Sequence, residues 1–213
     1  MEIKVMRNIM DVNDKLAKEN KAYFAEKKIA AVNVMASPGA GKTSVIMKVI
    51  SLLRGKVNFS VIEGDIASCI DAEKIEKEGI PVVQINTGGG CHLDANMIKE
   101  VVRERVDFDN TIMFIENVGN LVCPSAFDLG ENIRLVIASV PEGHDKPFKY
   151  PAMFEGANAI ILNKVDLLPY IEFDKDEFYK GVRAVNASAP VFEVSCRTGE
   201  GLDGLMDWFV SLK

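Results

Sequence analysis

A glycine-rich turn between two regular segments constrains the fold of this chain more than any other feature. The turn reads Ala-Ser-Pro-Gly-Ala-Gly-Lys-Thr-Ser at residues 36–44. An apolar run at 29–35 precedes it and is typical of a buried strand. Apolar residues then recur at helical spacing between 44 and 53. A strand, a glycine-rich turn and a helix in this order predict a phosphate-binding loop.

The loop carries the residue types that hold a nucleoside triphosphate. Glycines let the backbone approach the phosphates, and consecutive N–H groups at the start of a helix form an anion site. Lys42 would reach the β- and γ-phosphates, and the Thr43 hydroxyl would ligate Mg²⁺. Ala36 stands where the motif usually has its first glycine, so its φ must be negative. The predicted nucleotide-binding residues of the loop are Gly39, Ala40, Gly41, Lys42, Thr43 and Ser44.

Length and charge exclude several classes of protein. A chain of 213 residues is expected to form one domain with a sufficient core. Its net charge is −6, and no run of Lys and Arg forms a basic face, which argues against nucleic-acid binding. No apolar stretch reaches the roughly 18 residues of a membrane span, and no signal peptide is visible, so we expect a cytoplasmic protein. In that reducing compartment its four cysteines would bind metal, take part in redox chemistry or be buried.

Short apolar strands alternate with helical segments along the rest of the chain. The expected strands lie at 29–35, 58–63, 81–86, 111–115, 135–138, 159–162 and 191–194. The expected helices lie at 44–53, 71–78, 93–106, 150–154 and 201–212, and the stretch 120–131 is expected to be irregular. This alternation predicts an α/β fold: a mostly parallel sheet with helices on both faces. Ligands on such sheets bind at the carboxyl ends of the strands, where the motifs described below fall.

The first 28 residues are charged but carry an apolar stripe. Ile9, Val12, Leu16 and Tyr23 lie roughly on one face, which predicts an amphipathic helix ahead of a domain at 29–213. The stripe either packs on the chain's own core or docks a partner. Since this segment has no Cys or His, we exclude it as a metal reservoir.

An Asn-Lys-Val-Asp sequence ending at Asp166 follows a buried strand and predicts recognition of guanine. The Asp166 carboxylate can accept hydrogen bonds from N1–H and the 2-amino group, which adenine does not offer together. Asn163 can reach N7, and the Lys164 stem can cover the base. Ser195 and Cys196, after the last strand, would bring a backbone N–H to O6. The alternative for Asp166 is a helix N-cap, and one residue could serve both roles.

Two strand-end carboxylates are candidates for the reacting end of the nucleotide. Asp65 and Glu116 would contact Mg²⁺ directly or through water and orient the attacking water, so that with Lys42 they form the predicted catalytic set. Gly119 would sense the γ-phosphate through its N–H. The alternative for each acid is a solvated carboxylate. Because no Gln or Arg finger is assigned, we expect slow turnover.

A second site is indicated by Cys91, His92 and Cys123, which follow two of the strands. Thiolate and imidazole ligands suit Zn²⁺ or Ni²⁺ rather than Mg²⁺. One chain offers three ligands, fewer than a closed zinc site needs, and two chains could share metal across a two-fold axis. The alternative is that these cysteines are buried without a ligand. No pattern assigns a role to Cys69, Cys196 and His144.

These motifs together resemble the HypB family of GTPases, which assist nickel delivery to [NiFe]-hydrogenase. The resemblance runs from about residue 8 to the end and includes the segments 37–43, 63–65, 86–95, 116–124, 145–151 and 163–166. It implies a P-loop GTPase of the SIMIBI class that uses GTP/GDP and Mg²⁺. It also implies a GTP-linked homodimer with a Ni²⁺ or Zn²⁺ site at its interface, built from Cys91, His92 and Cys123. A HypA-like nickel chaperone docking on the N-terminal region and a hydrogenase large subunit as client are the implied partners.

The chain departs from many family members in two places. It lacks an N-terminal Cys-rich nickel motif or His-rich tract, so high-affinity nickel storage is not expected. Cys196 and Arg197 stand where an Ala-Lys pair is usual. Three other readings stay open: a urease-type accessory GTPase such as UreG, a regulatory GTPase with structural or inert cysteines, and a module that binds nucleotide without turnover. The first has a Cys-Pro-His metal motif, whereas this chain has Cys91, His92 and Leu93 in sequence.

Overall fold

Seven parallel strands form one sheet at the centre of the molecule. The computed structural model describes residues 2–66, 69–105 and 108–212. The strands are β1 (Ala30–Ala36), β2 (Phe59–Asp65), β3 (Val82–Asn86), β4 (Ile112–Glu116), β5 (Ile133–Ser139), β6 (Ala159–Asn163) and β7 (Val191–Val194). Their spatial order is β3-β2-β4-β1-β5-β6-β7, and every neighbouring pair is parallel. The strand order reverses around β1, which puts the loop after β1 at the point where such sheets bind ligands.

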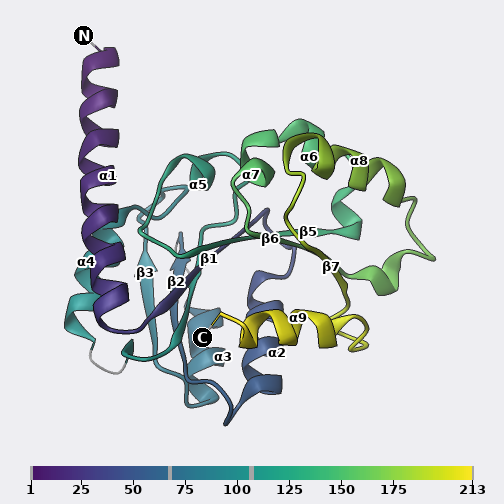
Figure 1. Cartoon of the computed structure of the whole chain (residues 1–213), viewed down its shortest axis with the longest axis horizontal. Helices are drawn as coiled ribbons and strands as arrows, with labels where there is room; N and C mark the ends of the chain where they lie inside the picture. The colour runs from purple at the N-terminus through teal and green to yellow at the C-terminus, as the bar shows by residue number, and fades with distance from the viewer. Residues whose placement is uncertain (1, 67–68, 106–107, 213) are drawn as a thin grey trace.

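Helices cover both faces of this sheet, as the sequence predicts (Figure 1). The helices are α1 (Glu2–Glu26), α2 (Lys42–Leu53), α3 (Ile70–Lys77), α4 (Ala95–Glu104), α5 (Cys123–Ala126), α6 (Lys146–Lys149), α7 (Pro151–Glu155), α8 (Lys175–Val185) and α9 (Leu202–Val210). Side chains of α2, α3 and α9 share one core cluster with the sheet. Those of α1 and α4, and those of α7 and α8, form two clusters on the opposite face. No helix among the described residues is both long and apolar enough to cross a membrane.

All seven predicted strands are confirmed, each with ends within two residues of the expectation. Helix α4 begins at Ala95 rather than 93, because the Asp94 side chain caps it by accepting a hydrogen bond from Met97 N at 2.9 Å. Residue 106, the last of that predicted helix, lies outside the described residues. The stretch 120–131, expected to be irregular, contains the short helix α5.

Helix α8 has no counterpart among the segments expected from the sequence. Its start carries a signal that identifies it: the Asp174 side chain accepts a hydrogen bond from Glu177 N at 2.9 Å. Phe178 and Val182 are buried four residues apart, which places them on one helical face. Val185 packs against the same cluster, so apolar residues recur at helical spacing in this segment as well.

Helix α1 packs on the domain through its C-terminal part. Ala17 and Phe24 are buried, whereas Val12 is 58% exposed and Leu16 and Tyr23 are half-buried. The face that packs on the chain's own core is therefore offset from the predicted stripe, whose first residue, Ile9, has no described side chain. Two buried asparagines add hydrogen bonds: Asn13 pairs with Ala95 N and Asp128 O, and Asn20 donates to Ala95 O and Leu129 O. The N-terminal end of the helix extends beyond the sheet (Figure 1). The domain boundary between 28 and 29 stays a prediction.

Candidate functional site

The glycine-rich turn forms a loop between the buried end of β1 and the start of α2. Among the described residues, positive φ outside glycine occurs at Lys28, Asn110 and Lys164, so Ala36 has the negative φ that its position requires. Gly41, the N-cap of α2, has φ of 99°, and a Cβ there would lie 2.5 Å from Asn163 Nδ2. Glycine at this position is therefore required by both backbone conformation and space.

A cavity of about 690 Å³ lies beside this loop and collects the predicted phosphate-binding groups. Its lining includes Lys42, Thr43, Asp65, Glu116 and Gly119. Gly119 packs closely on the loop, since a Cβ there would approach Pro38 N to 3.0 Å. The strand ends thus bring together the residues assigned to Mg²⁺ and to the γ-phosphate.

Hydrogen bonds within this cavity hold the Thr43 hydroxyl between two acids. Thr43 Oγ1 lies 2.8 Å from Glu116 Oε1 and 3.2 Å from Asp71 Oδ2. Asp71, in the first turn of α3, also accepts from Lys74 Nζ at 2.6 Å. No spacing rule connects Asp71 or Lys74 to the loop, so the sequence motifs do not predict a role for either. The one indication of their proximity to the site is that they lie in the short helix that follows β2.

Two buried carboxylates in the cavity are incompletely satisfied. Glu63 is 2% exposed and Glu116 is 4% exposed, and the Oε2 atom of each has no hydrogen-bond partner. The two residues lie side by side on β2 and β4. Burial raises the pKa of Glu63 to about 8, with the Glu116 charge adding to the shift. Burial also raises the pKa of Glu116, against the opposing influence of the Lys42 ammonium. Orphaned buried acceptors of this kind fit a cation site.

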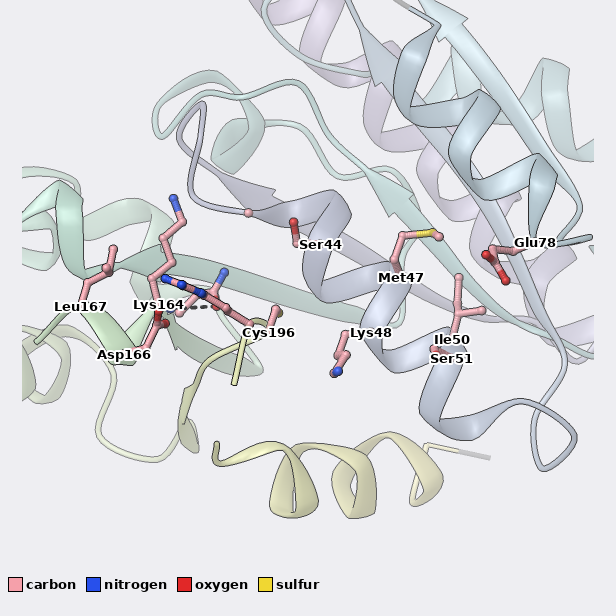
Figure 2. Close-up of a pocket in the computed structure, with 13 residues that line it drawn as sticks. Ser44, Met47, Lys48, Ile50, Ser51, Glu78, Lys164, Asp166, Leu167 and Cys196 are labelled. Carbon is pink, nitrogen blue, oxygen red and sulfur yellow. Dashed lines mark hydrogen bonds between the residues drawn. The ribbon is translucent and has the colours of Figure 1, made fainter. Parts of the chain in front are cut away.

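A second cavity, of about 700 Å³, adjoins the first and is lined by Asn163, Lys164, Asp166 and Cys196 of the predicted guanine-binding set (Figure 2). Ser195, the fifth member, is fully buried and is not among the lining residues. Both cavities are lined by Gly41, Ser44 and Lys164, so they form one continuous site. Helix α2 forms one wall, and the loops carrying Asp166 and Cys196 form another. Burial raises the pKa of the Cys196 thiol, which therefore stays protonated at neutral pH.

The guanine-binding side chains already have partners within the protein. Asn163 Nδ2 donates to Ala40 O at 3.0 Å, and Lys164 Nζ donates to Gly39 O at 2.6 Å. Asp166 Oδ1 accepts from the Ser195 hydroxyl at 2.7 Å. The Ser195 N–H donates to Glu200 O and is therefore not free to bind the base. A hydrogen bond to guanine O6 would have to come from the backbone amides that follow Ser195. Asn163 and Lys164 therefore hold the phosphate-binding loop in place as well as lining the cavity.

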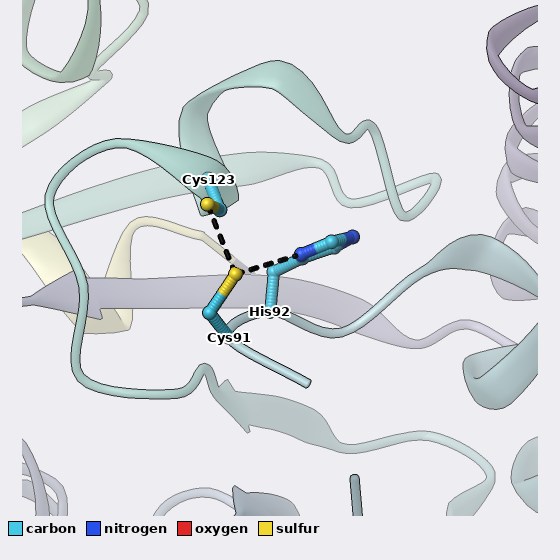
Figure 3. A group of neighbouring side chains, drawn as sticks. All are labelled: Cys91, His92 and Cys123. Carbon is cyan, nitrogen blue, oxygen red and sulfur yellow. Dashed lines mark hydrogen bonds between the residues drawn. The ribbon is translucent and has the colours of Figure 1, made fainter. Parts of the chain in front are cut away.

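Cys91, His92 and Cys123 lie together in the segments that follow β3 and β4 (Figure 3). One potential ligand atom from each lies within 4.8 Å of the others. The two sulfur atoms are 3.0 Å apart, and Cys91 Sγ is 3.6 Å from His92 Nδ1. The His92 ring stacks on Phe127 at 3.9 Å between centroids. Two thiols and an imidazole at this separation match the donor set that Ni²⁺ and Zn²⁺ prefer.

The local sequence explains how these ligands meet. Cys91 ends a glycine-rich turn in which Gly88 and Gly89 have positive φ, and Thr87 Oγ1 closes the turn on Gly90 O at 2.7 Å. Cys123 is the first residue of α5, where the following proline suits the start of a helix. Cys69 and His144 do not belong to this group of ligands, and their roles stay unassigned.

Comparison with known proteins agrees with this geometry. Residues 30–193 match the family described as CobW/HypB/UreG, nucleotide-binding domain. The chain is 45% identical over 206 residues to the hydrogenase maturation factor HypB of Escherichia coli K12. This alignment covers 97% of this chain and 71% of that protein. A crystal structure of HypB from Helicobacter pylori in complex with nickel superimposes with a TM-score of 0.88 at 34% identity, covering 93% of this chain and 94% of that one.

A more distant likeness concerns the fold alone. The signal recognition particle receptor FtsY from Elizabethkingia anophelis gives a TM-score of 0.57 at 16% identity, over 95% of this chain and 73% of that one. The architecture is therefore that of an α/β P-loop GTPase of the SIMIBI class. With its sequence identity, its family match and its fold in agreement, the chain belongs to the HypB family.

Proposed function

We propose that this protein is a GTP-hydrolysing metallochaperone that carries nickel at Cys91, His92 and Cys123 and assists its insertion into [NiFe]-hydrogenase. The observation that carries this proposal is the group of three donor atoms within 4.8 Å of one another, beside the nucleotide cavity. The Helicobacter pylori relative described as a nickel complex supports the choice of metal. Zn²⁺ suits the same ligands and is the competing occupant.

The nucleotide is GTP, and GDP after turnover. Asp166 would exchange its bond to the Ser195 hydroxyl for the two donors of guanine, and the amide of Cys196 would meet O6. Asn163 and Lys164 hold the loop on which the phosphates rest, as their bonds to Ala40 and Gly39 indicate.

Hydrolysis would be carried out by groups that line the first cavity. Lys42 would hold the β- and γ-phosphates, and the Gly119 N–H would contact the γ-phosphate; both residues line this cavity. Thr43, Asp65 and Glu116 would hold Mg²⁺, which when bound neutralises charge on the phosphates. The orphaned Oε2 of Glu116 fits this role. Asp65 and Glu116 would also orient the attacking water.

The metal centre provides three ligands and leaves room for more. A second copy of the chain related by a two-fold axis could complete it, so we propose a homodimer whose formation depends on GTP and metal. A HypA-like nickel chaperone and a hydrogenase large subunit are the proposed partners. We assign the protein to the cytoplasm, where those clients would be assembled.

Measurement of nickel affinity with GDP and with a non-hydrolysable GTP analogue tests this function. We expect different affinities in the two states, and loss of stoichiometric binding in Cys123→Ala but not in Cys69→Ala. Phosphate release should be measurable in the wild type and vanish in Lys42→Ala, which separates a GTPase from a module that only binds nucleotide. Unchanged metal binding in Cys123→Ala would instead indicate a regulatory GTPase with inert cysteines.

A further inference from the structure

Two asparagine side chains on either side of Gly119 reach across to the loop that carries the metal ligands. Asn117 is fully buried, and its Oδ1 accepts from Leu93 N at 3.1 Å and from Val118 N at 3.0 Å. Asn120 Nδ2 donates to Cys91 O at 3.3 Å. The backbone on both sides of His92 is therefore held by side chains from the segment that follows β4.

The same segment is the part of the nucleotide cavity closest to the phosphate-binding loop. Gly119 lines that cavity, and its Cα lies so near Pro38 that a Cβ would come within 3.1 Å of two Pro38 backbone atoms. Asn117 N and Asn120 N donate to Val34 O and Ala36 O of β1 at 3.0 and 2.9 Å. A phosphoryl group that contacts Gly119 would therefore act on a short segment that is anchored at both ends by asparagines.

The orientation of the Asn117 amide is fixed by a chain of buried partners. Its Nδ2 donates to Asn33 Oδ1 at 3.2 Å, and Asn33 Nδ2 donates in turn to Glu131 Oε1 at 3.2 Å. Glu131 also accepts from Leu129 N and from Arg134 Nε, so it serves as the acceptor that ends the chain. With its amide nitrogen committed to Asn33, Asn117 must present its oxygen to Leu93.

We propose that Asn117 and Asn120 are positioning residues that transmit the state of the nucleotide at Gly119 to Cys91 and His92. This inference rests on the proposed function, because it requires both a nucleotide-dependent segment and a metal site. A buried N–H that loses its acceptor is costly, so the loop with Leu93 follows Asn117 rather than separating from it. Coupling between two sites is reciprocal, and typical values change affinity by about 5- to 150-fold.

The test compares nickel affinity in excess GDP with that in excess non-hydrolysable GTP analogue, for wild type, Asn120→Ala and Asn117→Ala. We expect the wild-type ratio of the two affinities to fall toward one in each variant, while nickel still binds with the same stoichiometry. By linkage, the effect of nickel on affinity for the GTP analogue should fall by the same factor. Asn96→Ala is the matched control, since Asn96 is exposed on α4 and bonds only to Glu100 among the described contacts.

The outcomes distinguish this inference from the function on which it rests. A wild-type ratio of one overturns the nucleotide-dependent metal site itself, and the coupling role with it. A wild-type ratio that differs from one and persists in both variants overturns the role of the asparagines alone. If Asn117→Ala fails to fold, the half-buried Asn120 decides, because its replacement removes a bond from Cys91 O without opening the core. A general loss of structure would lower both affinities together and leave their ratio unchanged.

Discussion

The nucleotide cavity and the metal centre lie close together but are built in different ways. The cavity is formed at strand ends, where Glu63, Glu116 and Asn163 are almost fully buried. The metal centre is formed by a glycine-rich turn and a four-residue helix, and Cys91 is exposed. The first site is thus part of the folded core, whereas the second lies on connecting segments that the core holds in place.

This difference has a consequence for how each site responds to change. Side chains of the nucleotide site already have partners in the protein, as the bonds of Asn163 to Ala40 and of Asp166 to Ser195 demonstrate. A ligand there exchanges one partner for another, and a substitution affects both binding and stability. In the metal centre the Cys91 thiol contacts the other two ligands, Cys123 and His92, so a substitution of Cys91 should affect binding alone.

The largest effect is expected for the base-recognition residue. Asp166→Asn would lose two charge-assisted hydrogen bonds to guanine, so affinity for GDP should fall by about 1,000-fold. Xanthosine diphosphate should bind the variant better than GDP does, because the new amide can donate to the 2-oxo group. Titration with both nucleotides measures this, with the exposed Asp207→Asn as control. Retained GDP affinity would mean that Asp166 only holds the Ser195 hydroxyl and does not read the base; it is not a helix N-cap, because Lys164 occupies that position.

A smaller effect, confined to binding, is expected in the metal centre. Cys91→Ala should weaken nickel binding by roughly 100-fold, because one of three ligands is lost. Its thermal midpoint without metal should stay within about 2 °C of wild type, since exposed positions contribute little to stability. Calorimetry of binding and of unfolding tests the two parts. A large drop in midpoint would remove the contrast between the two sites.

The smallest effect concerns the protonation of Glu63 in the protein without Mg²⁺ or nucleotide. Its pKa rises from 4.5 to about 8 on folding, so the folded state keeps a proton that the unfolded state loses. The stability it contributes is therefore full below pH 4.5 and is lost as pH rises toward 8. Glu63→Gln should not show this loss, so its free energy of unfolding should exceed that of the wild type by about 2 kcal/mol between pH 6 and 8. Denaturant unfolding in the presence of a chelator, at a series of pH values, measures this difference. If the free energies of unfolding of the wild type and of Glu63→Gln changed with pH in parallel, the prediction would be contradicted.

Much of the fold could be predicted from the sequence because its signals are local. Apolar runs located the strands, and the turn at 36–44 located the nucleotide cavity. Helix α8 was not among the expected helices, although Phe178, Val182 and Val185 recur at helical spacing and Asp174 marks its start. Asp71 and Glu63 were missed for another reason: their proximity to Thr43 and Glu116 depends on strand order, which no local pattern contains.

The hydrogen bonds of α1 bear on the order in which the protein can assemble during synthesis. Asn20 pairs with a residue 75 positions later, and Asn13 with one 115 positions later. At ribosomal rates these partners follow the helix by on the order of ten seconds. During that interval Phe24 has only part of its final cluster, because Leu93, Ile98 and Leu129 are made later than Ile29 and Ile62. Helix α1 is thus made before the residues that secure it, and it is fully packed only once the chain has been made as far as Leu129.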